Sequence, residues 1–168
     1  RMARGVAREV SEELQSPTAE LYDAIITGKT GHLFSLAAAW GAMTAGEDEA
    51  VVAAFAEYGL SAGRAMQIAD DIADMRSPGA GGRDGRPGSE VLLQRCLPPG
   101  KEGAGRALGS MLDAEIAGAV ARITGEVRQR VPPEIREGLG QVVRDIVGLT
   151  IAGVPTDGGA PLAGLLQR

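Results

Sequence analysis

The chain has 168 residues, which suits one domain with one sizeable hydrophobic core. Its formal net charge of -5 argues against the basic surface that nucleic-acid-binding proteins normally carry. The single cysteine excludes an internal disulfide and favours a cytoplasmic location, and no window holds the roughly 18 uninterrupted apolar residues of a membrane span.

The first predicted helix spans residues 1–14, and its apolar residues recur every four positions: Met2, Val6, Val10 and Leu14. Because no cap precedes this helical pattern, we expect the chain to begin inside a helix, as a fragment or a processed half would. A break follows at Ser16 and Pro17, with Ser16 as the expected N-cap of a second helix and Pro17 at its first position. The expected inward residues of that helix are Leu21, Ile25 and Ile26.

The second helix should loosen at Thr27 and Gly28, just before Lys29 and Thr30. Taken alone, Lys29 is most simply an ordinary surface lysine. A third helix is predicted over 33–45, where many alanines would let another helix approach closely. Trp40 lies within it and is expected in the core or in a pocket wall.

The longest predicted helix opens at a turn over 46–49 and carries three acids near its C-terminal end. At about 3.6 residues per turn, Asp70 and Asp74 share one face and Asp71 borders it. Gln67 lies one turn earlier, next to both Asp70 and Asp71. The sequence therefore predicts a compact group of three carboxylates with one amide beside it.

Three carboxylates this close repel one another, and the helix C-terminus adds partial negative charge. A cation would relieve that repulsion. Clustered carboxylates suit Mg²⁺, which keeps several waters and shares its shell with substrate phosphates. The alternative is a solvated acidic patch, or a set of partners for arginines.

Beyond the acids, a flexible loop is predicted over 77–100 from its glycine, proline and arginine content. Amphipathic helices are expected over 101–130 and 134–151, followed by a loose tail over 153–168. The expected inward residues of the last helix are Ile135, Leu139, Val142, Val143, Ile146 and Val147. No strand is indicated, so residues 1–168 are predicted to form a single all-α domain.

The stretch from Tyr22 to Asp74 resembles the C-terminal half of the trans-isoprenyl diphosphate synthases, also called polyprenyl synthetases. The segments that carry the resemblance are Tyr22-Asp-Ala-Ile-Ile-Thr-Gly-Lys29-Thr30-Gly-His-Leu-Phe34, Gly41-Ala, Tyr58-Gly59, and Gln67 followed by Asp70-Asp71-x-x-Asp74. The last of these is similar to the family's second aspartate-rich motif. The resemblance implies an isoprenoid-synthase-type helical bundle, of which this chain would supply the C-terminal half around a central cavity.

The resemblance also implies a function, the Mg²⁺-dependent condensation of an allylic prenyl diphosphate with isopentenyl diphosphate. The residues it assigns are Asp70, Asp71 and Asp74 to the metal, Lys29, Thr30 and Gln67 to the diphosphate, Phe34 to the cavity wall, and Arg95 in place of a family lysine. A homodimer is implied, or pairing with an N-terminal half or second subunit that holds the first aspartate-rich motif. The alternatives are a non-catalytic partner of another prenyl synthase and a class I terpene cyclase relative.

Overall fold

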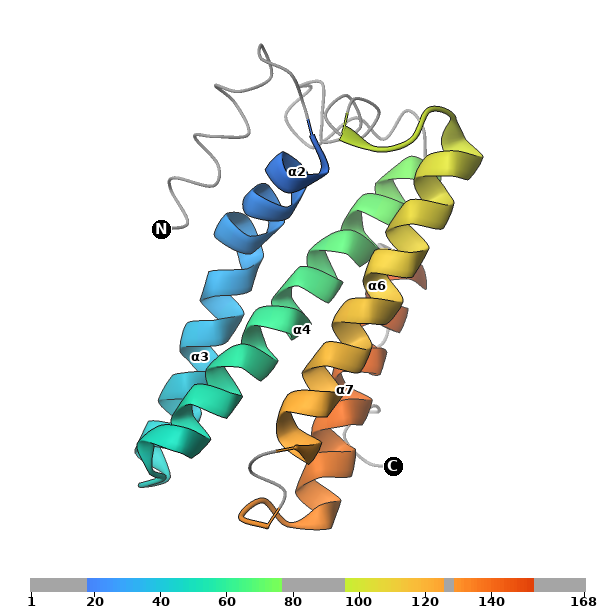
Figure 1. The fold of residues 1–168 in the computed structure, drawn as a ribbon. Helices are drawn as coiled ribbons and strands as arrows, with labels where there is room; N and C mark the ends of the chain where they lie inside the picture. Colours follow the sequence, from blue (N-terminus) through green and yellow to red (C-terminus); the bar gives the residue numbers. More distant parts are fainter. Residues whose placement is uncertain (1–17, 77–95, 126–128, 153–168) are drawn as a thin grey trace, which may run out of the picture.

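The computed structural model describes residues 18–76, 96–125 and 129–152, in which every regular element is a helix (Figure 1). The elements are α2 (Ala19–Ile26), the π-helical turn η1 (Thr27–Gly31), α3 (His32–Thr44), α4 (Glu49–Arg76), α6 (Lys101–Thr124) and α7 (Pro133–Ala152). The predicted all-α class is confirmed for this part of the chain. The helix expected over 1–14, residues 77–95 of the loop expected over 77–100, and the tail over 153–168 lie outside it.

Helix α4 is the centre of the arrangement. α2, η1 and α3 follow one path along one side of it, α6 lies on the other side, and α7 packs against both α4 and α6 (Figure 1). The largest fully buried side chains come from all of these layers: Tyr22, Ile26, Val51, Ile68, Leu108, Ile123 and Val143. The hydrophobic core therefore runs along α4, and its last turns carry the acids.

The helix ends follow from local capping. Thr18 has an extended backbone and its Oγ1 accepts a hydrogen bond from the Leu21 amide at 3.2 Å, so α2 begins at Ala19. The expected N-cap at Ser16 was therefore wrong by two residues. Asp48 caps α4 in the same way, since its Oδ1 accepts from the Val51 amide at 3.1 Å. Gly46 has a φ of 78°, a left-handed conformation that favours glycine and ends α3.

Two glycines of α4 let α3 lie against its backbone. A Cβ atom placed on Gly59 would stand 2.3 Å from the Phe34 carbonyl oxygen and 2.9 Å from the Ala38 Cβ. A Cβ placed on Gly63 would stand 2.9 Å from the Phe34 Cβ. The close approach expected from the small residues of α3 is thus matched by missing side chains on α4.

Trp40 was expected in the core or in a pocket wall, and that expectation was wrong: the residue is 64% exposed. α3 meets α4 through Phe34 and Ala38, and a residue two positions away from Ala38 points to the opposite side of the helix. The exposed large residues of α3 follow one stripe: Leu33, Leu36, Trp40 and Met43. No charged residue interrupts α3, so this helix is apolar on both sides.

Two expectations for the last helices were also wrong. α6 ends at Thr124, with Gly125 as its C-cap, and does not continue to residue 130. On α7 the buried residues are Gly140, Val143 and Val147, whereas Ile135 and Val142 lie off that stripe and are exposed. None of the helices in the described ranges is long and apolar enough to cross a membrane.

Candidate functional site

The turn η1 carries Lys29 and Thr30 and is wound as a π-helix, so the loosening expected after Thr27 takes this form. Its glycines are buried against α4. A Cβ placed on Gly31 would stand 3.1 Å from the Leu60 side chain, and one placed on Gly63 would stand 3.0 Å from the Thr30 carbonyl oxygen. The glycines therefore let η1 lie directly on α4. Such π-turns occur frequently at functional sites.

A chain of hydrogen bonds joins η1 to the acids of α4. Thr30 Oγ1 donates to Gln67 Oε1 at 2.8 Å. Gln67 Nε2 in turn lies 3.2 Å from Asp71 Oδ1 and 3.4 Å from Asp70 Oδ2, and donates to both carboxylates. The predicted position of Gln67 beside Asp70 and Asp71 is confirmed.

Asp71 points into the protein. Its residue is 2% exposed, and its Oδ2 accepts a hydrogen bond of 2.7 Å from the Tyr22 hydroxyl on α2. Burial raises the pKa of Asp71 to about 6, although hydrogen bonds from Tyr22 and Gln67 and the charge of Lys29 act in the opposite direction. Burial, followed by the charge of Asp71, strongly raises the pKa of the Tyr22 phenol, which therefore stays protonated as a donor.

Asp70 and Asp74 lie on the solvent side of α4. Loss of hydration raises the pKa of Asp70, and the negative charge of Asp74 raises it further, while Lys29 and the Gln67 amide act to lower it. Lys29 is thus close enough for its charge to act on the acids. Within the described ranges, however, no group of three or more Asp, Glu, His or Cys side chains is placed to hold a metal ion.

The structure brings together six of the residues that the sequence assigned to the site: Lys29, Thr30, Gln67, Asp70, Asp71 and Asp74. Phe34 lies on α3 with its Cβ against Gly63 of α4, partly buried against the core, and its expected role as a cavity wall stays a prediction. Arg95 lies outside the described residues. The sequence reasoning gave no site role to Tyr22, because nothing local shows which acid a residue 49 positions away will contact.

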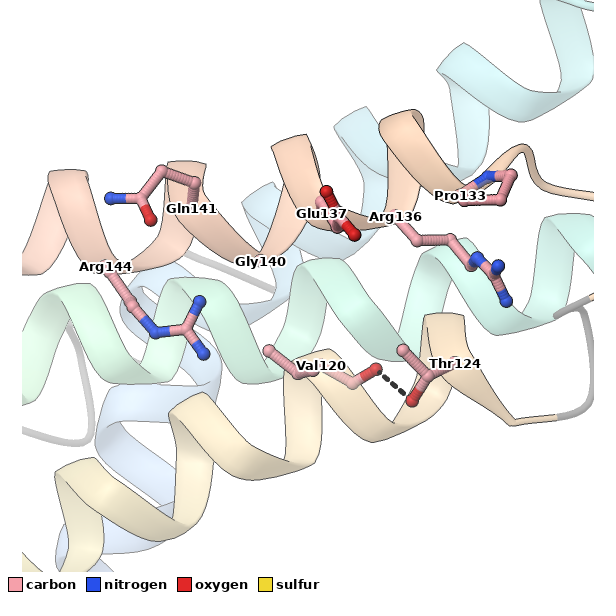
Figure 2. A pocket seen from close by; sticks show the side chains of 8 residues that line it. All are labelled: Val120, Thr124, Pro133, Arg136, Glu137, Gly140, Gln141 and Arg144. Atoms are coloured by element: carbon pink, nitrogen blue, oxygen red, sulfur yellow. Dashed lines mark hydrogen bonds between the residues drawn. The ribbon is translucent and has the colours of Figure 1, made fainter.

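A groove lies elsewhere, between α6 and α7, and has a volume of about 620 Å³. Figure 2 shows Arg136 and Arg144 extending from α7 toward α6, with Gly140 between them and Thr124 bonded to its own helix at Val120. None of the residues assigned to the site lines this groove. The expected central cavity is therefore not this groove, and the candidate site is the surface where η1 meets the acids of α4.

The helical bundle, and the contact of the Lys29–Thr30 turn with the acid-bearing end of α4, are what the resemblance to the isoprenoid synthases implies. The family model for polyprenyl synthetases matches residues 1–87 of the 168. The chain belongs to the polyprenyl synthetase family.

The chain is similar to two known proteins. Over 78 residues the chain is 38% identical to a geranylfarnesyl diphosphate synthase from Natronomonas pharaonis, a match that covers 46% of this chain and 23% of that protein. Its fold is similar to that of a polyprenyl synthase from Roseobacter denitrificans, with a TM-score of 0.57 and 21% identity, over 88% of this chain and 59% of that one. The chain thus spans only part of the length of each relative. The predicted isoprenoid-synthase-type fold is confirmed.

Proposed function

We propose that this chain is the part of a Mg²⁺-dependent prenyltransferase that carries the second aspartate-rich motif. The whole enzyme would condense an allylic diphosphate with isopentenyl diphosphate. The observation that carries the proposal is the hydrogen-bond path from Thr30 through Gln67 to Asp70 and Asp71. This path joins the turn that holds Lys29 to the helix that holds the acids, so both can act on one diphosphate. Family membership supports the same reaction class.

Magnesium fits the residues present as a site of two carboxylates. The charge of Asp74 raises the pKa of Asp70, which is the repulsion that a cation would relieve. Mg²⁺ is usually held by one or two carboxylates together with water and substrate phosphates. Asp70 and Asp74 would therefore hold the ion, and Asp71, which accepts hydrogen bonds from Tyr22 and Gln67, would orient this end of α4. When bound, the metal would neutralise charge that develops on the leaving diphosphate.

The residues of η1 would bind the diphosphate itself. Lys29 would neutralise it as a point charge, and the Thr30 hydroxyl would orient one phosphate oxygen. That hydroxyl hydrogen is donated to Gln67 Oε1, so it must leave Gln67 before it can donate to phosphate. Phe34 and Arg95 remain proposed contacts of the prenyl chain and of phosphate.

The bond changes are those of a head-to-tail transfer. The allylic C–O bond breaks and the diphosphate leaves with the electron pair. The double bond of isopentenyl diphosphate attacks the allylic carbon, and the product forms after loss of a proton. The part of this chain is to hold the leaving group and to set its orientation.

Binding of inorganic diphosphate to the 168-residue chain tests the proposal. With MgCl₂ present, calorimetry should show binding, and Asp70→Asn should weaken it by about tenfold or more, because a charge-assisted metal contact is lost. Asp113→Asn, on the exposed side of α6, is the matched control and should bind like the wild type. Equal affinity of the wild type and the Asp70 variant would contradict the proposal.

A non-catalytic subunit is the second candidate, because the described residues hold no ready group of three metal-binding side chains. It predicts no Mg²⁺-dependent diphosphate binding by the wild-type chain, so the same calorimetry separates the two. A cytoplasmic location, as the single cysteine suggests, belongs to both candidates.

The exposed stripe of α3 supports the expected pairing with another polypeptide. Helices that are apolar all round are normally covered on all sides, whereas α3 packs mainly against α4 within the described ranges. We expect a second copy of the chain to cover Leu33, Leu36, Trp40 and Met43. The remaining half of the fold is the alternative occupant.

Light scattering after gel filtration should therefore give twice the mass of the 17.2-kDa wild-type chain, and Trp40→Glu should give the single mass. A buried charge without a partner is strongly unfavourable, so the variant should not dimerise. Leu149→Glu, at an exposed apolar position of α7, should leave the dimer intact. A wild-type chain that is already monomeric would exclude self-pairing through α3.

A further inference from the structure

Arg64 on α4 joins three other elements through its guanidinium. Its Nη1 donates to Thr27 Oγ1 in η1 at 3.0 Å. Its Nη2 pairs with the Asp23 carboxylate on α2 and, at 2.7 Å, with the Glu115 carboxylate on α6. The side chains of Arg64 and Glu115 are only 19% and 17% exposed, whereas that of Asp23 is 46% exposed, so the pair of Arg64 and Glu115 is the largely buried part of this cluster.

The ion pairs of Arg64 fix the positions of its partners more than they stabilise the fold. Arg64 Nε is buried and has no hydrogen-bond partner within the described ranges, which is unfavourable for a polar group removed from water. Ion pairs of this kind often contribute little net stability compared with apolar residues of similar size. What an arginine supplies here is a planar fork whose donors reach fixed directions, and a lysine could not reproduce it.

Arg64 and Gln67 hold η1 at two points. Arg64 bonds Thr27, the first residue of the turn, and Gln67 bonds Thr30, three residues later. Arg64 and Gln67 are themselves three residues apart, one turn of α4. A single turn of α4 therefore contacts both ends of η1, which carries Lys29. Because Gly31 has no side chain, η1 lies against the aliphatic part of Arg64: a Cβ placed on Gly31 would stand 3.3 Å from the Arg64 Cγ.

We propose that Arg64 is a positioning residue, which acts through Thr27 to fix η1 so that Lys29 and Thr30 face the acids of α4. The inference rests on the proposed function, because it assigns a role toward the same diphosphate. Arg64 itself does not touch the substrate. It sets the start of η1, and the Gln67 contact sets its end.

Hydrogen exchange of the ligand-free chain tests the contact without any ligand. Thr27→Val removes the hydroxyl that Arg64 bonds, and peptides over residues 27–33 should exchange about fivefold faster, the factor expected for one net hydrogen bond. Peptides of α7 should be unchanged. Thr150→Val is the matched control, since Thr150 Oγ1 donates at 2.8 Å to the Ile146 carbonyl of its own helix. It should leave residues 27–33 as in the wild type.

Combining the substitutions shows whether Arg64 acts through Thr27. Arg64→Lys should loosen residues 27–33 as Thr27→Val does, and the double variant should loosen them no further. Glu115→Gln, which leaves the Thr27 contact in place, should loosen them less. Exchange in the Thr27 variant equal to that of the wild type, or loosening that adds fully in the double variant, would overturn the inference.

Calorimetry with inorganic diphosphate and MgCl₂ then separates positioning from mere support. Thr27→Val should weaken diphosphate binding about threefold to tenfold. Hydrogen exchange of α6 and α7 should be the same in the variant and the wild type, which shows that the rest of the fold is intact. If the wild type binds and the Thr27 variant binds equally well, Arg64 is a structural residue only and the proposed function stands. If the wild type does not bind at all, the proposed function fails, and the positioning role fails with it.

Discussion

Gly59→Val should destabilise the chain by at least about 3 kcal/mol, the upper range for overpacking a tightly packed contact. The added Cβ would stand 2.3 Å from the Phe34 carbonyl oxygen and 2.7 Å from the Phe34 carbonyl carbon. Both are backbone atoms, which cannot rotate out of the way as a side chain can. α3 would have to move off α4, and the apolar contacts between these two helices would be lost.

Urea unfolding followed by circular dichroism measures the free-energy difference. Gly138→Ala on α7 is the matched control, because a Cβ placed there meets nothing within 4 Å. It should stabilise the chain by about 0.5–1 kcal/mol, the usual gain from replacing glycine inside a helix. A loss below about 1 kcal/mol for the Gly59 variant would show that α3 is not held so closely against α4.

Asp71→Asn should change how stability depends on pH by about 3 kcal/mol. Burial raises the pKa of Asp71 from 3.8 to about 6 in the folded chain. Between those two values the folded state holds more protons than the unfolded state, so this group stabilises the fold most below pH 4. Its contribution is lost as pH rises through about 6, where a charge must be kept inside the protein. The variant cannot ionise and keeps its stability over the same range.

Urea unfolding of both proteins between pH 4 and pH 7.5, at constant ionic strength and without Mg²⁺, gives the difference directly. Other acids, such as Asp48, whose pKa is lowered by hydrogen bonds from the Val51 amide and from Arg130, titrate in both proteins and cancel. The variant should gain stability relative to the wild type as pH rises through about 6. A difference that does not change with pH would mean that Asp71 is not buried as the structure describes.

The sequence could predict the contacts between site residues that lie close together on one helix. Gln67, Asp70 and Asp71 belong to two successive turns of α4, and helix geometry alone places the amide beside both carboxylates. The contact between Tyr22 and Asp71 was out of reach, because it depends on how α2 packs against α4. The same holds for Arg64, whose partners lie on three other elements.

Trp40 shows why a helix can be predicted correctly while its buried side is predicted wrongly. An unbroken α-helix from Ile26 onward would turn Leu33 and Trp40 to the same side as Ile26. The side of α3 that meets α4 instead carries Phe34 and Ala38, so the contact side is shifted by one position from the side that holds Leu33. The apolar spacing of the sequence is compatible with either choice, because α3 has apolar residues all round.

The five-residue turn η1 accounts for that one-position offset, since a π-turn adopts i to i+5 bonds and takes up one residue more than an α-turn. A chain shortened by one residue within Thr27–Gly31 could form an uninterrupted rod from Ala19 to Thr44 with Phe34 and Ala38 still seated on α4. Such a chain would lose the π-helical turn that holds Lys29 and Thr30. The extra residue of η1 therefore separates the packing of α3 against α4 from the placement of Lys29 and Thr30.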